Sequence, residues 1–336
     1  MASRDAFRRQ TECRLRFVQS RFAPITQETK MKTDVKFPSN GLMLAGQLYT
    51  PDDYTTNERR AAIVVSHPFG GVKEQTAGLY AAKLANEGFI ALTFDASYQG
   101  ESEGEPRFLE NPFARAEDIK SAVTYLTTRD EVDPEHIGAL GICASGGYVP
   151  FAAQTEHRIK AVATVSGADM GALFREGLGG GQSEDVIRGM LDEAGKDRTE
   201  EALGKEPRLL NVVPETEEDA KGMPTLYREG RDYYRTPRAQ HPNSPNSWVA
   251  RSVDQIAQYS SYDLIHLISP RPLLMIAGTE ADTAYFSREA IEKANEPKEL
   301  YWIEGATHID LYDKDEYVPE VVTKLTGFFR ENLTSN

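Results

Sequence analysis

Hydrophobic and polar positions alternate along residues 33–49, and the period then changes near residue 60. The segments "TDVKF" and "LMLAGQLY" flank the turn "PSNG", which predicts an antiparallel pair of strands. The run "AAIVVSH" at 61–67 is apolar, as is typical of a strand buried on both faces of a sheet. The following stretch, "TAGLYAAKLANEG", has helical spacing that stops at Gly88. These periods predict a hairpin, then a buried strand and a helix.

Strand and helix periods then repeat in turn. Further strands are predicted at "FIALTFD" (89–95), "HIGALGI" (136–142) and "IKAVATVSG" (159–167), with helices at "PFARAEDIKSAVTYLTT" (112–128) and "GGYVPFAAQ" (146–154). Strands that alternate with helices form right-handed βαβ units and build a parallel sheet covered by helices on both faces. The predicted fold class is α/β, with a mostly parallel, doubly wound sheet.

The alternation stops after Gly167 for about a hundred residues, which is too long for a plain connection in a compact domain. The interrupting segment is helical in content, in "SEDVIRGMLDEAG" (183–195) and "EEDAKGMPTLYREGRDYY" (217–234). The alternation resumes with the strand "RPLLMIAG" (271–278), and the closing helix is predicted at 318–333.

This interruption predicts three parts of the chain. An insertion between late strands of an open α/β sheet lies over their carboxyl ends, where such sheets bind ligands. We therefore expect an N-terminal extension (1–30), an α/β core (31–170 and 263–336) and a helical cap (171–262) over the active site.

The net charge of the sequence argues against some classes of binding partner. The 38 Lys and Arg residues are outnumbered by 52 Asp and Glu residues, and the net charge of −14 argues against nucleic acid because it repels a phosphate backbone. No apolar run approaches the roughly 20 residues of a membrane-spanning helix. We expect a neutral or weakly charged small-molecule substrate.

The number of cysteines indicates the redox state of the compartment and whether a metal site is expected. The two cysteines, Cys13 and Cys143, make neither a disulfide framework nor a Cys-rich metal pattern, so neither a metal nor a cofactor is expected. A reducing, cytoplasmic compartment fits this usage. The Arg-rich stretch at residues 1–30 leaves mitochondrial targeting as an alternative to a docked extension. The oligomeric state is open, with a homodimer among the options.

The segment "GALGICASGG" (138–147) places a cysteine and a serine at a strand-to-helix junction. A nucleophile elbow needs small residues two positions before and after the nucleophile, because the backbones crowd together there. With Cys143 as the nucleophile, Gly141 and Ser145 are these residues; with Ser145 as the nucleophile, they are Cys143 and Gly147. The first register is preferred because the strand then ends directly before the turn.

Two other interpretations of these cysteine and serine patterns are possible. Most free cysteines are small buried hydrophobes, but the Gly-x-Cys-x-Ser-Gly-Gly context favours a nucleophile at Cys143. The segment "GESEG" (100–104) also matches the serine-hydrolase pattern, yet Pro106 and charged residues follow it and no helix begins. Ser102 is therefore interpreted as a loop residue.

A thiol with a free pKa of about 8.5 needs a helix N-terminus and a base to become a nucleophile. The helix after Ala144 supplies the first. His308 in "EGATHIDLYD" is the predicted base, because it follows the last strand by a short loop and so reaches the same edge of the sheet. For the acid that orients the imidazole, Asp282 is chosen, with Glu280, Asp169 or no acid as alternatives.

Two further groups complete the predicted site. The oxyanion of a tetrahedral intermediate needs N–H donors, and the backbone N–H groups of Ala144 and Phe69, in "HPFGG", are expected to supply them. In the cap, the pair Tyr233 and Tyr234 is predicted to line an acyl pocket, as are Tyr227 and Arg231; a solvated helix face is the alternative.

The order of "HPFGG", "GICASGG", "GTEADT" and "THID" resembles the α/β-hydrolase superfamily from about Met31 to the end. The elbow cysteine is similar to that of dienelactone hydrolase, Gly-x-Cys-x-Gly-Gly, with Ser145 in place of the middle glycine. With "HPFGGVKEQTA", "YQGESEGEPR" and "HIDLYD", the chain resembles a branch that includes polyketide transferases of secondary metabolism. The family pattern implies the acid three residues after Gly278, where Ala281 stands.

This resemblance implies acyl chemistry on small-molecule or carrier-bound thioesters and similar substrates. A thiolate with a pKa of about 8.5 leaves a tetrahedral intermediate more readily than an alkoxide, so a cysteine enzyme suits thioesters, activated esters and lactones. We therefore predict a hydrolase or acyltransferase with an acyl-cysteine intermediate. The alternatives are a serine carboxylesterase that uses Ser145 and a non-catalytic binding module on a hydrolase fold.

Overall fold

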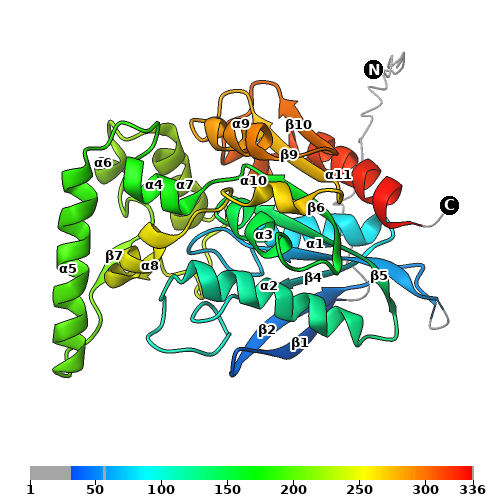
Figure 1. The fold of residues 1–336 in the computed structure, drawn as a ribbon, viewed down its shortest axis with the longest axis horizontal. Coiled ribbons are helices and arrows are strands. Elements are labelled where there is room, and N and C mark those ends of the chain that lie inside the picture. The colour runs from blue at the N-terminus through cyan, green and yellow to red at the C-terminus, as the bar shows by residue number, and fades with distance from the viewer. Residues whose placement is uncertain (1–31, 56–57, 335–336) are drawn as a thin grey trace, which may run out of the picture.

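Eight strands form the central sheet of the computed structural model, which describes residues 32–55 and 58–334 (Figure 1). In spatial order they are β1 (Lys32–Ser39), β2 (Leu42–Tyr49), β4 (Ile90–Phe94), β3 (Arg60–Ser66), β5 (Val132–Ile142), β6 (Ile159–Val165), β9 (Leu273–Gly278) and β10 (Lys298–Ile303). The pairs β1–β2 and β2–β4 are antiparallel and the others are parallel. The predicted extension at 1–30 lies outside the described residues.

Successive side chains of a strand point to opposite faces, so the sheet has two cores. In β3, Ala62 and Val64 belong to one buried cluster, and Ile63 and Val65 to the other. This explains the continuous apolar run at 61–67. The first cluster is shared with α2 (Pro112–Thr127), α3 (Ser145–Ala153) and α9 (Ala284–Lys293), and the second with α1 (Thr76–Asn86) and α11 (Val318–Leu333).

The segment at 171–262, here called the cap, lies to one side of the sheet (Figure 1). Its elements, with those that adjoin it, are α4 (Met170–Glu176), α5 (Glu184–Ala202), β7 (Leu209–Asn211), α6 (Glu217–Ala220), α7 (Thr225–Arg235), β8 (Ser247–Val249), η1 (Ala250–Ser252), α8 (Val253–Gln258) and η2 (Ile265–Ile268). The sequence at 217–234 forms two helices, since Gly222 takes φ 74° and Pro224 precedes the second helix. The short pair β7–β8 was not predicted.

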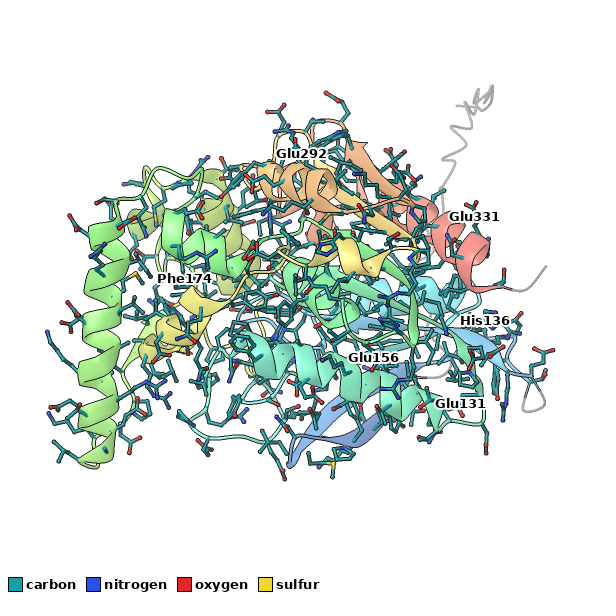
Figure 2. The ribbon with its side chains drawn as sticks, in the orientation of Figure 1. Glu131, His136, Glu156, Phe174, Glu292 and Glu331 are labelled. Carbon is teal, nitrogen blue, oxygen red and sulfur yellow. The ribbon has the colours of Figure 1, made fainter. Side chains whose placement is uncertain are left out.

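Figure 2 shows the side chains of the described residues on this fold. Glu292 on α9 and Glu331 on α11 are both exposed. Among the helices of the described ranges, none combines the length and the apolar character needed to cross a membrane.

Candidate active site

Cys143 lies at a sharp turn between β5 and α3. Its φ is 57°, a left-handed conformation that is strained for a residue with a Cβ and that often marks functional sites. The turn is closed by the Gly146 N–H, which donates to the Cys143 carbonyl at 2.7 Å. A Cβ on Gly141 would overlap the Ser145 carbonyl, and one on Gly146 would overlap Gly167. The small residues of the motif are therefore required by backbone contact.

Ser145, the alternative nucleophile, lies beneath the turn and is fully buried. Its hydroxyl donates to the His67 carbonyl at 2.6 Å, and Arg115 Nη2 donates to the hydroxyl at 2.9 Å. The Ser66 hydroxyl is a third contact, at 2.9 Å. This hydroxyl is bound within the protein and does not line the cavity at Cys143, so the structure brings Cys143, and not Ser145, to that cavity.

The Cys143 thiol faces two backbone donors and one hydroxyl. The N–H groups of Ala144 and Phe69 and the hydroxyl of Tyr312 form hydrogen bonds with it. Burial raises the pKa of the thiol, and these hydrogen bonds act in the opposite direction because they favour the thiolate. The structure thus brings both predicted oxyanion donors to the sulfur.

His308 follows β10 and precedes α10 (Asp310–Asp313). Its ring is buried, and burial lowers its pKa to about 3, so the imidazole is neutral at pH 7. Nδ1 lies 2.5 Å from the Thr283 hydroxyl and Nε2 lies 3.3 Å from the Tyr312 hydroxyl. His308 lines the same cavity as Cys143.

The predicted acid is not at the imidazole. Asp282 Oδ2 accepts a hydrogen bond from the Leu226 N–H in the cap at 3.0 Å, whereas the adjacent Thr283 contacts His308. Neighbouring residues of a short loop point in different directions, which sequence alone does not resolve. The prediction of Asp282 as the orienting acid therefore disagrees with the structure.

The two alternative acids are placed elsewhere as well. Glu280 is exposed. Asp169 caps α4 by accepting the Ala172 N–H at 3.2 Å and also accepts the Ser261 N–H at 3.0 Å. In the described geometry, a neutral hydroxyl takes the place of the triad carboxylate.

A cavity of about 240 Å³ opens beside the thiol. Its apolar lining includes Phe174 from α4, Leu226 from α7 and Trp248 from β8. Of the predicted tyrosines, Tyr234 and Tyr227 line this cavity; Tyr233 does not, because its ring packs behind Tyr312 at 5.1 Å. Arg231 is also absent from the lining and pairs with Glu217 at 3.5 Å.

Tyr312 is the site residue that sequence reasoning missed. It stands four residues after His308 in "THIDLY", a spacing that brings two side chains to one side of a helical turn. That spacing was the available signal, although the helix here has only four residues.

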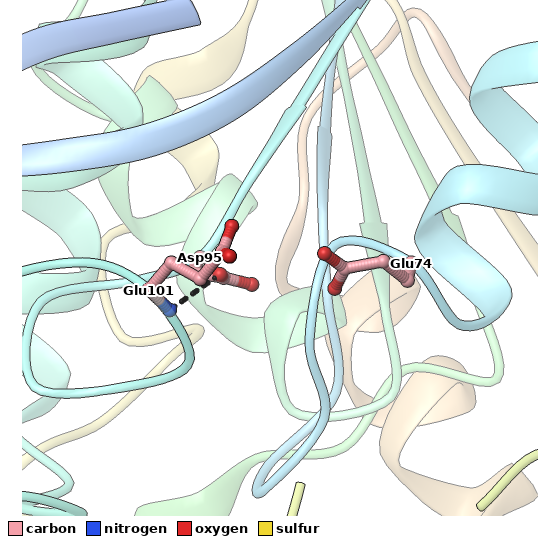
Figure 3. Close-up of side chains that lie close together, drawn as sticks. All are labelled: Glu74, Asp95 and Glu101. Carbon is pink, nitrogen blue, oxygen red and sulfur yellow. Dashed lines mark hydrogen bonds between the residues drawn. The ribbon is translucent and has the colours of Figure 1, made fainter. Parts of the chain in front are cut away.

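Three carboxylates also gather away from the thiol, on Glu74, Asp95 and Glu101 (Figure 3). The Lys73 ammonium lies 2.7, 2.8 and 2.7 Å from them, respectively. A lysine therefore already supplies the positive charge, and the cluster does not fit a metal ion. Ser102 lies in the adjacent loop and donates to the Asp95 carbonyl at 2.6 Å.

Comparison with known proteins places the chain in a family. Residues 44–174 match the model described as "Dienelactone hydrolase family". The uncharacterized protein YcjY of Escherichia coli is 40% identical over 90% of this chain and 100% of its own length. The chain belongs to the dienelactone hydrolase family.

Two further proteins are similar to this chain over most of its length. A crystal structure of the hypothetical protein PA2218 from Pseudomonas aeruginosa matches with a TM-score of 0.85 and 36% identity, covering 92% of this chain and 98% of that one. Polyketide transferase grgF from a Penicillium species is 26% identical over 92% of this chain and 99% of its own. The predicted α/β-hydrolase fold and the family resemblance are confirmed, and the protein is an α/β-hydrolase enzyme of the hydrolase or acyltransferase class.

Proposed function

We propose that this enzyme transfers the acyl group of a thioester or activated ester to Cys143 and then to water or an alcohol. The observation that carries the proposal is the strained turn at Cys143, which presents the thiol to the N–H groups of Phe69 and Ala144 in a cavity shared with His308. These are the parts that acyl transfer through a covalent intermediate requires.

The proposed reaction has two halves. Sulfur attacks the acyl carbon while the thiol proton moves to His308, and the carbonyl oxygen becomes an oxyanion that accepts hydrogen bonds from Phe69 and Ala144. Collapse breaks the bond to the leaving group, which takes the proton back from the imidazolium. Water or an alcohol then attacks the acyl-cysteine with the same base, and the thiol is restored.

The lining of the cavity indicates which kind of acyl group it can accept. Its lining is mainly aliphatic and aromatic, which suits an uncharged chain or ring. The proposed substrates therefore carry an uncharged acyl group.

Intact-protein mass spectrometry after incubation with a medium-chain acyl thioester tests this function. The wild type and Ser145→Ala are expected to gain one acyl mass, because Ser145 is bound beneath the turn, and Cys143→Ala is expected to gain none. Thermal melts check that each variant is folded. Acylation of folded Cys143→Ala would contradict the proposal.

The low pKa of His308 predicts an unusual pH profile. Since the imidazole stays neutral down to about pH 3, kcat/KM at pH 5.5 is expected to lie within about two-fold of that at pH 7.5. A histidine with the ordinary pKa of about 6.5 would instead lose roughly ten-fold over this range.

The variant Thr283→Asp tests the same explanation of the pH profile. A carboxylate at Nδ1 stabilises the imidazolium and raises the pKa of His308. The fall of kcat/KM on the acidic side of the pH profile, here called the acid limb, is therefore expected to move into the range between pH 5.5 and 7.5. The control Thr283→Val keeps the shape of the side chain and removes the hydroxyl, which is expected to lower kcat/KM at every pH without moving the limb. An acid limb near pH 6.5 in the wild type contradicts the neutral, buried imidazole.

A further inference from the structure

The Tyr312 hydroxyl lies between the nucleophile and the base. It contacts His308 Nε2 at 3.3 Å and forms a hydrogen bond with the Cys143 thiol. Within residues 32–55 and 58–334, no hydrogen bond joins the thiol directly to the imidazole. This hydroxyl therefore contacts both the sulfur and the base.

The position of Tyr312 is fixed from several sides. Its carbonyl accepts the Thr76 hydroxyl at 2.9 Å, and the neighbouring Leu311 carbonyl accepts the Tyr80 hydroxyl at 2.6 Å. Its ring is 1% exposed and packs edge-on against Tyr233, with centroids 5.1 Å apart. These contacts hold the hydroxyl at the thiol without using the hydroxyl itself.

The hydrogen bonds can run in one consistent direction. With the proton of the neutral imidazole on Nδ1, that N–H donates to the Thr283 hydroxyl and leaves Nε2 as an acceptor. The Tyr312 O–H can then donate to Nε2, which lies 3.3 Å away, and its oxygen can accept from the S–H of the neutral Cys143 thiol. Sulfur and imidazole nitrogen are thereby linked by two hydrogen bonds through one oxygen.

We propose that Tyr312 is a catalytic proton relay between Cys143 and His308. The relay rests on the function proposed above and adds a residue to its mechanism. As sulfur bonds to the acyl carbon, the S–H proton moves to the Tyr312 oxygen and the Tyr312 proton moves to Nε2. The tyrosine ends neutral, the imidazole becomes imidazolium, and no further reactant is needed. On collapse the two protons travel back toward the leaving group along the same path.

Tyr312→Phe removes only the relaying oxygen. Its rate of Cys143 acylation, measured by rapid quench and mass spectrometry, is expected to fall about 100-fold, since general acid–base catalysis contributes 10²–10⁴-fold. Tyr233→Phe is the matched control, because it removes another buried hydroxyl of the same cluster, one that is bonded to the Thr76 N–H and does not line the cavity. That control is expected to acylate within about three-fold of the wild type.

Two readouts separate a relay from a structural role. The wild type is expected to show a curved dependence of the acylation rate on the D₂O fraction, because two protons move, and Tyr312→Phe is expected to lose that curvature. The pH midpoint of Cys143 alkylation by iodoacetamide is expected to rise in Tyr312→Phe, because the hydroxyl stabilises the thiolate.

The outcomes also separate the relay from the function on which it rests. Acylation of Cys143→Ala overturns the acyl-cysteine mechanism itself. If Cys143→Ala is inert while Tyr312→Phe acylates as fast as Tyr233→Phe, with an unchanged alkylation midpoint, the function stands and the relay is wrong.

Discussion

Replacing Cys143 by alanine is expected to lower kcat/KM for an acyl thioester by at least about 10⁴-fold, since the covalent route is lost. Cys143→Ser is expected to fall by about 10³-fold or more, although the side chain keeps its size. An alcohol is a far weaker acid than a thiol, so the same neutral imidazole, with a pKa of about 3, generates much less alkoxide than thiolate. Steady-state assays with one thioester compare the variants.

The other cysteine of the chain provides the control for these variants. Cys13→Ser removes a thiol with the same chemical change and is expected to retain the wild-type rate within about two-fold. If folded Cys143→Ser retains more than a tenth of the wild-type kcat/KM, the nucleophile is not this thiol.

Replacing Arg115 by alanine is expected to destabilise the fold by about 3–5 kcal/mol, because a buried charge loses its partner. Arg115 and Glu110 are 2% and 1% exposed, with Nε and Oε1 3.8 Å apart. Arg115 Nη2 also donates to the His67 carbonyl at 2.5 Å and to the Ser145 hydroxyl at 2.9 Å. Arg115 thus links the segment "HPFGG", which contains Phe69, to the turn at Cys143. Its loss is therefore expected to slow acylation as well.

Calorimetry measures this effect as a fall in Tm of roughly 4–7 °C. Arg188→Ala is the matched control, because its pair with Glu184 is 71% and 82% exposed and is expected to change Tm by only about 1 °C. Arg115→Met with Glu110→Gln removes both charges and is expected to destabilise less than Arg115→Ala alone. Equal Tm values for Arg115→Ala and Arg188→Ala contradict this role.

The periods along the chain were sufficient to predict the sheet and most of its helices. A run such as 61–67 is apolar because each face of β3 has its own core, and that signal is local. The pair β7–β8 has three residues in each strand, too few to show a period. Gly222 and Pro224 interrupt the helical pattern at 217–234, and this local signal indicates the break between the two helices.

The candidate site was predictable where the backbone determines it. A cysteine between glycines at a strand-to-helix junction indicated the turn at Cys143, and chain order after the strands placed Phe69 and His308 at the same edge. The partner of His308 depends on which side chain of one loop points inward, so Asp282 was chosen where Thr283 lies. The apolar lining comes from cap residues far apart in sequence, and no local pattern marks them.

Peptide mapping of the acylated wild-type protein tests the central claim most directly. The protein is incubated with an acyl thioester, digested at acidic pH to preserve a thioester bond, and sequenced by tandem mass spectrometry. The account predicts the acyl mass on Cys143 and its removal by neutral hydroxylamine. An acyl mass on Ser145, or on another residue that persists in Cys143→Ala, would contradict it.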